Sequence, residues 1–226
     1  MFKKLLLCSA LLVTFATALA QSSQNFGIAG TISPSPCSVT LTGGVANLGT
    51  VSKAIVKAYT PAANDTVYLV PFVLVPIAVI CGAATKVEVS FTDNKSGKKF
   101  PVDANDLIRF GITDDTAGTQ AIGSYQVSFS DTTIDNVVVG VYLSAQNGTG
   151  PITWLTKIAG TFFSSNVVAP GYVTGFAKTA GAGTPDAFKT LSGNLNFQAY
   201  LSKAYIDSAT NNVKPTGSGT LTLVYL

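Results

Sequence analysis

The last seven residues of this 226-residue chain carry large apolar side chains at every second position, Leu221, Leu223 and Tyr225. Such alternation is typical of a β-strand that buries one of its two faces. Because the sequence ends directly after this strand, no later segment is left to pair with it. We therefore expect an unprotected strand edge at this end of the chain.

A second alternating segment lies near the other end of the chain, ahead of Cys37. The residues that share one face of this segment are Phe26, Ile28, Gly30 and Ile32. The segment stands outside any obvious compact unit, so we interpret it as a spare strand. A spare strand in a chain that also has an open edge favours assembly of several copies by strand exchange.

The first twenty residues have the pattern of a secretory signal peptide. Lys3 and Lys4 precede an apolar stretch over residues 5–19, and Ala18 and Ala20 form a small-x-small cleavage site. The stretch is too short to be a membrane-spanning helix. We expect cleavage before Gln21, export of the chain, and a residual length of 206 residues (226 − 20).

The composition favours a β-rich extracellular protein. Charged residues make up 11% of the chain, against about 25% in typical soluble domains. The chain has no histidine, so the commonest general base and metal ligand are both missing. It also lacks the basic stripe of a nucleic-acid-binding protein. We predict a protein that is not an enzyme and has no catalytic residues, cofactor, metal site or nucleic-acid partner.

Two cysteines remain once the predicted signal peptide is removed, Cys37 and Cys81. Export to an oxidising compartment predicts that they form a disulfide. The alternative, a metal-binding or redox pair, is disfavoured by their wide spacing and by the lack of histidine.

Short runs of β-branched and aromatic residues, separated by turn residues, predict a β-sandwich instead of a parallel α/β fold. The predicted strands cover residues 38–41, 45–48, 67–80, 86–91, 107–113, 125–129, 137–145, 152–155, 160–163, 172–176, 191–202 and 220–225. We interpret Pro71 and Pro76 as bends near the start of a core strand that ends at Cys81. Glu88, the only glutamate, is predicted to lie on the solvated face of a strand.

Four segments, taken in order, resemble the subunits of chaperone-usher fimbriae, the pili of Gram-negative bacteria. The first is residues 28–32 with Cys37 five residues later, and the second is residues 45–51 followed by Cys81. The third is residues 139–143 followed by 147–148 and 151–152, and the last comprises residues 197–200, Gly217 and Tyr225. The chain departs from the family in length, because residues 91–137 are expanded relative to a usual shaft subunit.

The resemblance implies an incomplete immunoglobulin-like β-sandwich over residues 37–226, with an N-terminal donor-strand extension over residues 21–36. In this family the sandwich lacks its last strand, and the donor residues Phe26, Ile28, Gly30 and Ile32 would fill the groove of a neighbouring subunit. The strand with Leu221, Leu223 and Tyr225 would bind the chaperone before assembly. The implied partners are a periplasmic chaperone, an outer-membrane usher and neighbouring pilus subunits. The implied location is the cell-surface fimbrium, reached through the periplasm, with a role in adhesion.

Two other functions are compatible with the sequence. The first is a secreted, monomeric β-sandwich binding module that folds residues 26–32 back into its own groove. The second is a secreted enzyme, which the lack of histidine disfavours.

Overall fold

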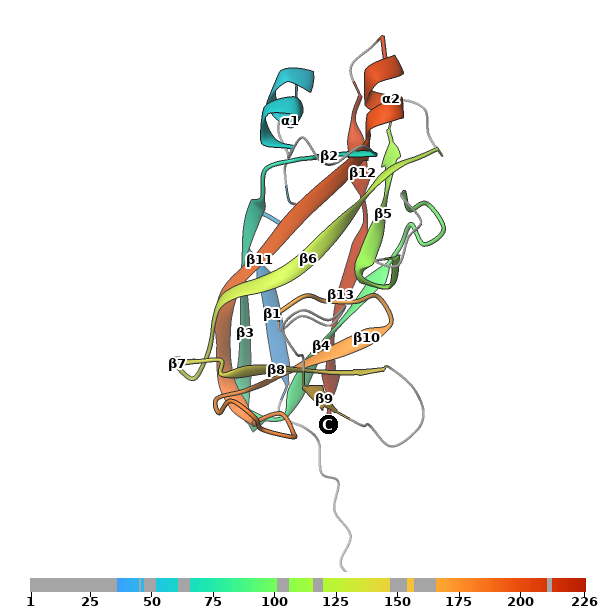
Figure 1. Ribbon diagram of the computed structural model, residues 1–226. Coiled ribbons are helices and arrows are strands. Elements are labelled where there is room, and N and C mark those ends of the chain that lie inside the picture. The colour runs from blue at the N-terminus through green and yellow to red at the C-terminus, as the bar shows by residue number, and fades with distance from the viewer. Residues whose placement is uncertain are drawn as a thin grey trace, which may run out of the picture. The chain divides into compact units, whose positions relative to one another are not determined.

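The computed structural model describes residues 36–44, 46, 52–60, 66–100, 106–115, 120–146, 154–156, 166–210 and 213–226 (Figure 1). Most of these residues lie in antiparallel strands that form two sheets. This confirms the predicted all-β, sandwich-like fold class. The predicted donor residues Phe26 to Ile32 and the predicted signal peptide lie outside the described residues.

The larger sheet has the strand order β1-β3-β11-β6-β5-β12, with β2 beside β11 and β7 beside β6. Its strands are β1 (Cys37–Leu41), β2 (Val67–Leu69), β3 (Val73–Thr85), β5 (Arg109–Asp114), β6 (Ala121–Ile134), β7 (Val137–Val138), β11 (Phe188–Ser202) and β12 (Pro215–Gly217). The smaller sheet has the order β13-β4-β10-β8-β9. Its strands are β4 (Val87–Asp93), β8 (Val141–Gln146), β9 (Leu155–Thr156), β10 (Tyr172–Ala177) and β13 (Gly219–Tyr225).

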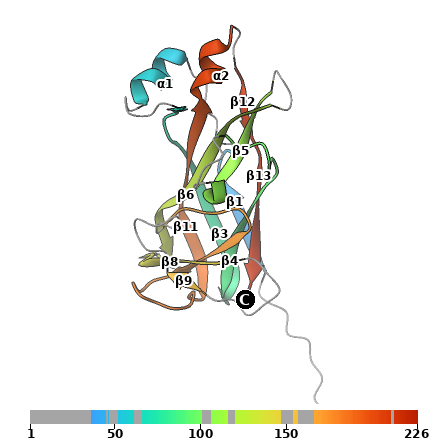
Figure 2. The same cartoon turned by 45° about the vertical axis from the view of Figure 1, so that its right-hand side comes forward.

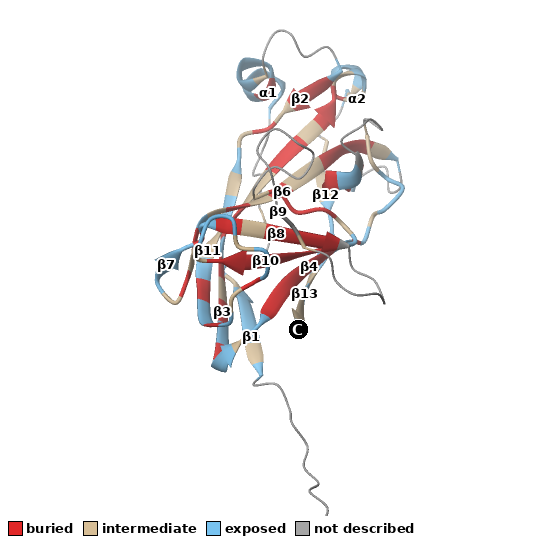
Figure 3. Cartoon of the chain, turned by 60° about the horizontal axis from the view of Figure 1, so that its bottom comes forward, coloured by how far each residue is buried: buried red, intermediate tan, exposed pale blue. Residues whose placement is uncertain are grey.

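The main hydrophobic core joins the inner faces of the two sheets. The larger sheet contributes Ile77, Val79, Phe110, Val127, Phe129, Phe188, Leu191 and Leu195, and the smaller sheet contributes Val87, Val89, Phe91 and Phe176. Phe129 and Phe176 meet edge to face across the core, with ring centroids 5.2 Å apart. Buried positions alternate along β3, as expected of a strand with one covered face, and Figure 3 shows this alternation in colour.

The chain crosses from one sheet to the other between β12 and β13. Gly217 pairs with Ile112 of the larger sheet, whereas Gly219 pairs with Asp93 of the smaller sheet. A Cβ atom at Gly217 would lie 2.5 Å from the ring of Tyr125, so only glycine fits at this corner. The crossing fixes where β13 enters the smaller sheet.

Two short helices, which the sequence did not predict, cover one end of the larger sheet (Figures 1 and 2). They are α1 (Lys53–Tyr59) and α2 (Lys203–Ser208), and a 3₁₀ turn, η1 (Asp106–Ile108), precedes β5. Ser52 and Ser202 cap the two helices by accepting a backbone N–H three residues on. Val56 of α1 and Ile206 of α2 belong to a second, smaller hydrophobic cluster. Among the described helices, none is long and apolar enough to cross a membrane.

The structure corrects the interpretation of the two prolines. Pro71 does lie at a break, between β2 and β3, but Pro76 is inside β3, which continues past Cys81 to Thr85. The carbonyl of Pro76 accepts the N–H of Thr42, one residue beyond the end of β1. The N–H that proline lacks therefore falls where the ladder between β1 and β3 ends, and the strand tolerates it.

Candidate strand-binding site

Strands β1 and β13 are edges of the two different sheets. β1 pairs with β3, and β13 pairs with β4. Within the described part of the chain, neither strand has a second neighbour. The two edges lie near each other in Figure 2, and a hydrogen bond joins them at one end. We call the line between β1 and β13 the seam.

The inward-facing side chains of β1 are only partly covered. Cys37, Val39 and Leu41 alternate on the face that turns toward the core, and Val39 is 37% exposed. Their partners on β3 are covered by the opposite sheet, because Val79, which pairs with Val39, is 0% exposed. Cys37 and Leu41 are half-buried against the core. The core is therefore open along β1.

The inward-facing side chains of β13 show the same partial burial. Leu221 and Leu223 are half-buried against the core, and Tyr225 is 38% exposed. On the adjacent strand β4, Val89 is 1% exposed and Val87 0%. The inward-facing side chains are thus fully buried on β4 and only partly buried on β13. β13 is therefore the second strand along which the core is open.

The backbone of β13 also points hydrogen-bonding groups toward the seam. The N–H of Leu226 donates to Lys86 and the carbonyl of Ser218 accepts from Asn94, so even-numbered residues face β4. Backbone groups in an antiparallel ladder alternate in direction along the strand. The N–H and C=O groups of Leu221 and Leu223 therefore face away from β4, toward the seam.

The same alternation holds for β1. Thr42 donates its N–H to Pro76, and the carbonyl of Pro36 accepts from Gly82, so even-numbered residues face β3. The backbone groups of Val39 consequently face the seam. An extended segment lying between β1 and β13 would find hydrogen-bond donors and acceptors on both sides.

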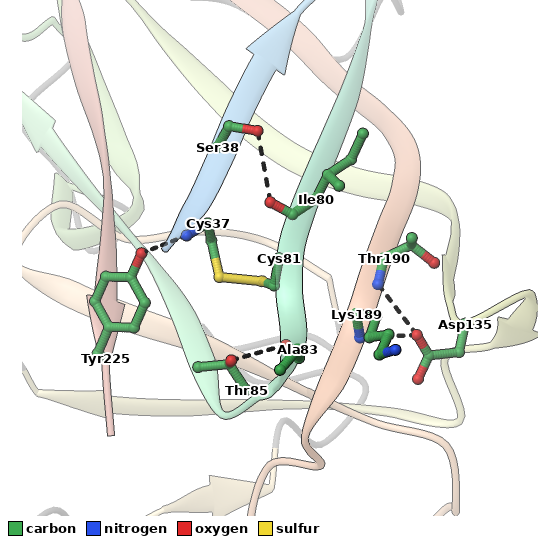
Figure 4. The surroundings of a disulfide bond; sticks show 10 residues. All are labelled: Cys37, Ser38, Ile80, Cys81, Ala83, Thr85, Asp135, Lys189, Thr190 and Tyr225. Carbon is green, nitrogen blue, oxygen red and sulfur yellow. Dashed lines mark hydrogen bonds between the residues drawn. A yellow bond between two sulfur atoms is a disulfide. The ribbon is translucent and has the colours of Figure 1, made fainter. Parts of the chain in front are cut away.

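One end of the seam is bridged beside a disulfide. Cys37 and Cys81 form the disulfide, as the sequence predicts, and it ties the start of β1 to β3. The N–H of Cys37 donates to the phenol oxygen of Tyr225 over 2.8 Å. Figure 4 shows the ring of Tyr225 reaching from β13 to the first residue of β1. At this end a single side chain, that of Tyr225, bridges the two strands.

These features suit the binding of an added strand. Its apolar side chains would complete the burial of Val39, Leu221 and Leu223, and its backbone would pair with the groups of these residues that face the seam. Full burial of such a side chain stabilises by about 1.5–3 kcal/mol, and each net hydrogen bond adds about 0.5–1.5 kcal/mol.

The structure brings together the predicted C-terminal strand residues and the predicted disulfide. Leu221, Leu223 and Tyr225 share the inner face of β13, and Tyr225 contacts Cys37 directly. Sequence reasoning missed Val39 as a residue of the opposite margin. The alternation of Cys37, Val39 and Leu41 could have indicated that Val39 faces the core. It could not have shown that β13 is the edge strand opposite β1.

The prediction that Glu88 is solvated is wrong. Its side chain points to the outer face of β4, as the alternation indicates, yet it is 0% exposed. Its two carboxylate oxygens have no hydrogen-bond partner among the described residues. Trp154 and Pro185 pack over Gly175 of the adjacent strand β10, so the outer face carries a second layer. Burial raises the pKa of Glu88 to about 7.

Within the described residues, no three metal-ligating side chains gather. Compared with known proteins, the chain matches no family model, and no curated protein is significantly similar to it. The assignment of a function therefore rests on the seam and on the sequence segments described above.

Proposed function

We propose that the chain is a structural subunit of a chaperone-usher fimbria that polymerises by donor-strand exchange and contributes to surface adhesion. The seam of one copy takes up the segment with Phe26, Ile28, Gly30 and Ile32 from the next copy. The observation that carries the proposal is the pair of facing edges, β1 and β13, with their inward side chains left partly exposed.

In this proposal the sandwich is of the immunoglobulin-like type and lacks its final strand. An exposed edge beside an open core invites aggregation, so a periplasmic chaperone holds β13 by Leu221, Leu223 and Tyr225 until assembly. An outer-membrane usher then presents the seam to the next subunit, and the fibre forms on the cell surface. The disulfide is typical of such an exported, oxidising compartment.

Polymer formation tests the proposal. Surface-sheared material from wild-type cells should give a heat-stable ladder on gels. Ile28→Asp should abolish the ladder, because a carboxylate cannot enter an apolar seam without a large cost. Thr31→Asp is the matched control, since residue 31 alternates to the opposite face of the same segment. Ladders that survive Ile28→Asp would contradict the proposal.

A mixing experiment separates the donor from the acceptor. Val39→Asp should also abolish the ladder, because it places charge in the seam at β1, away from the β13 residues that the chaperone holds. Thr40→Asp, on the exposed face of the same strand, should not. Val39→Asp chains keep an intact donor segment and the β13 residues that the chaperone holds, and Ile28→Asp chains keep an intact seam. Co-expression of the two should therefore give one heat-stable dimer and no longer species. A wild-type protein that stays monomeric when pure, and forms no such dimer, would favour the alternative module that folds its own segment back.

A further inference from the structure

The two ends of the seam are not equivalent. At the Cys37 end, the Tyr225 ring lies across the seam and its phenol oxygen accepts the Cys37 N–H. At Val39, Leu41, Leu221 and Leu223 no hydrogen bond joins β1 to β13 in the described part of the chain. Within the described residues, the seam is therefore bridged at its Cys37 end and not beside Leu221.

The bridge occupies a backbone group that an added strand needs. Odd-numbered residues of β1 point their N–H groups toward the seam, and the Cys37 N–H is the first of them. A strand that pairs with β1 along its full length must take this N–H from Tyr225. The disulfide to Cys81 fixes the position of Cys37, so β1 cannot move aside, and the tyrosine side chain has to swing out.

We propose that Tyr225 is a latch, which holds the seam shut at the Cys37 end and must open before an incoming strand can pair with the Cys37 N–H. The proposal rests on the proposed function of the seam as a strand acceptor. In the closed state the phenol oxygen accepts the Cys37 N–H. An incoming strand can pair with the full length of β1 only after the phenol has left the Cys37 N–H, so opening of the latch limits the rate at which the strand seats.

Loss of the phenol oxygen should weaken the closed state while keeping the ring. A net hydrogen bond of this kind corresponds to a factor of roughly two to ten in an equilibrium constant. Tyr225→Phe should therefore speed the seating of a strand by about that factor. Tyr59→Phe is the matched control, because Tyr59 is similarly exposed, at 39%, and lies on α1.

The test uses the exported chain carrying Ile28→Asp, which prevents its own segment from donating. A fluorescent peptide with the sequence of residues 21–36 is added, and its association rate is measured for chains with Tyr225, Tyr225→Phe and Tyr59→Phe. We expect faster seating with Tyr225→Phe alone. Hydrogen exchange of the free protein should show faster exchange of the Cys37 N–H in the same variant.

The possible outcomes distinguish the latch from the proposed ability of the seam to accept a strand. Peptide binding at equal rates in all three chains, or slower binding to Tyr225→Phe, would overturn the latch and leave strand acceptance intact. Absence of peptide binding in all three chains would overturn strand acceptance, and the latch with it. An unchanged Cys37 exchange rate in Tyr225→Phe would also contradict the latch, because the closed state would not depend on the phenol.

Discussion

The buried carboxyl of Glu88 should make the stability of the protein depend on pH in a window where little else titrates. The chain has a single glutamate and no histidine, the side chain that ordinarily changes its charge between pH 5 and 8. Burial raises the pKa of Glu88 from 4.5 to about 7. The folded state therefore prefers the protonated acid, and the unfolded state ionises first as the pH rises.

The sign and size of the effect follow from proton linkage. Below about pH 4.5 the carboxyl is protonated in both the folded and the unfolded state, so it does not change how the free energy of unfolding depends on pH. Between about pH 4.5 and 7 the unfolded state has lost more protons, so the free energy of unfolding falls as the pH rises. The rise of the pKa from 4.5 to about 7, at about 1.4 kcal/mol per pKa unit, sets an upper limit of about 3 kcal/mol. Relaxation and water entry reduce this limit, so we expect a loss of about 1–3 kcal/mol.

Glu88→Gln removes the titration and should flatten the curve. The assay is urea unfolding of the exported chain at several pH values between 5 and 7.5, with wild type and variant compared at constant ionic strength. Asp115→Asn, which changes an exposed carboxyl in a turn, should keep the wild-type slope. A flat wild-type curve, or the same slope in Glu88→Gln, would refute the argument that this carboxyl is buried without a partner.

Three further predictions concern the sandwich itself. Replacing Cys37 and Cys81 together by serine should lower the free energy of unfolding by up to about 4 kcal/mol, since the bridge closes a loop with a sequence separation of 44; chemical denaturation of the non-reduced proteins measures it, and an unchanged midpoint would contradict the disulfide. Gly217→Ala should destabilise the corner between the sheets by about 1–3 kcal/mol, because the new methyl group meets the Tyr125 ring 2.5 Å away; a variant as stable as wild type would mean that the ring yields freely. Phe176→Ala should cost about 3–5 kcal/mol, because its ring is fully buried between the sheets; a loss below about 1 kcal/mol by thermal unfolding would contradict the packing.

Strands that begin and end at turn residues nearby in the sequence were predicted from the sequence pattern. Alternation and turn signals placed β4, β10 and β13 within two residues of their observed limits. The cysteine pair was predicted from the expected compartment, with the wide spacing and the lack of histidine disfavouring a metal-binding or redox pair. Both short helices were missed, because a helix of six or seven residues does not span two turns of the apolar pattern.

Features that depend on contacts between distant segments could not be predicted. The alternation of residues 86–91 correctly gave the outward direction of Glu88. It gave no sign that Trp154 and Pro185, more than sixty residues later, add a second layer on that face. That β13 is an edge strand could be predicted from its own sequence. That β1 is the edge strand facing it could not, because this depends on the order of strands in both sheets.

Hydrogen exchange at single amides tests the central claim, that the seam between β1 and β13 accepts a strand. The exported chain with Ile28→Asp is compared by NMR with and without an excess of the peptide of residues 21–36. Without peptide, the N–H groups of Leu221, Leu223 and Val39 should exchange fast, and those of Thr222 and Val224, which face β4, should exchange slowly. With peptide, the three fast amides should slow by at least about tenfold, as hydrogen-bonded amides do. A peptide that binds without slowing them, or that does not bind at all, would contradict the claim.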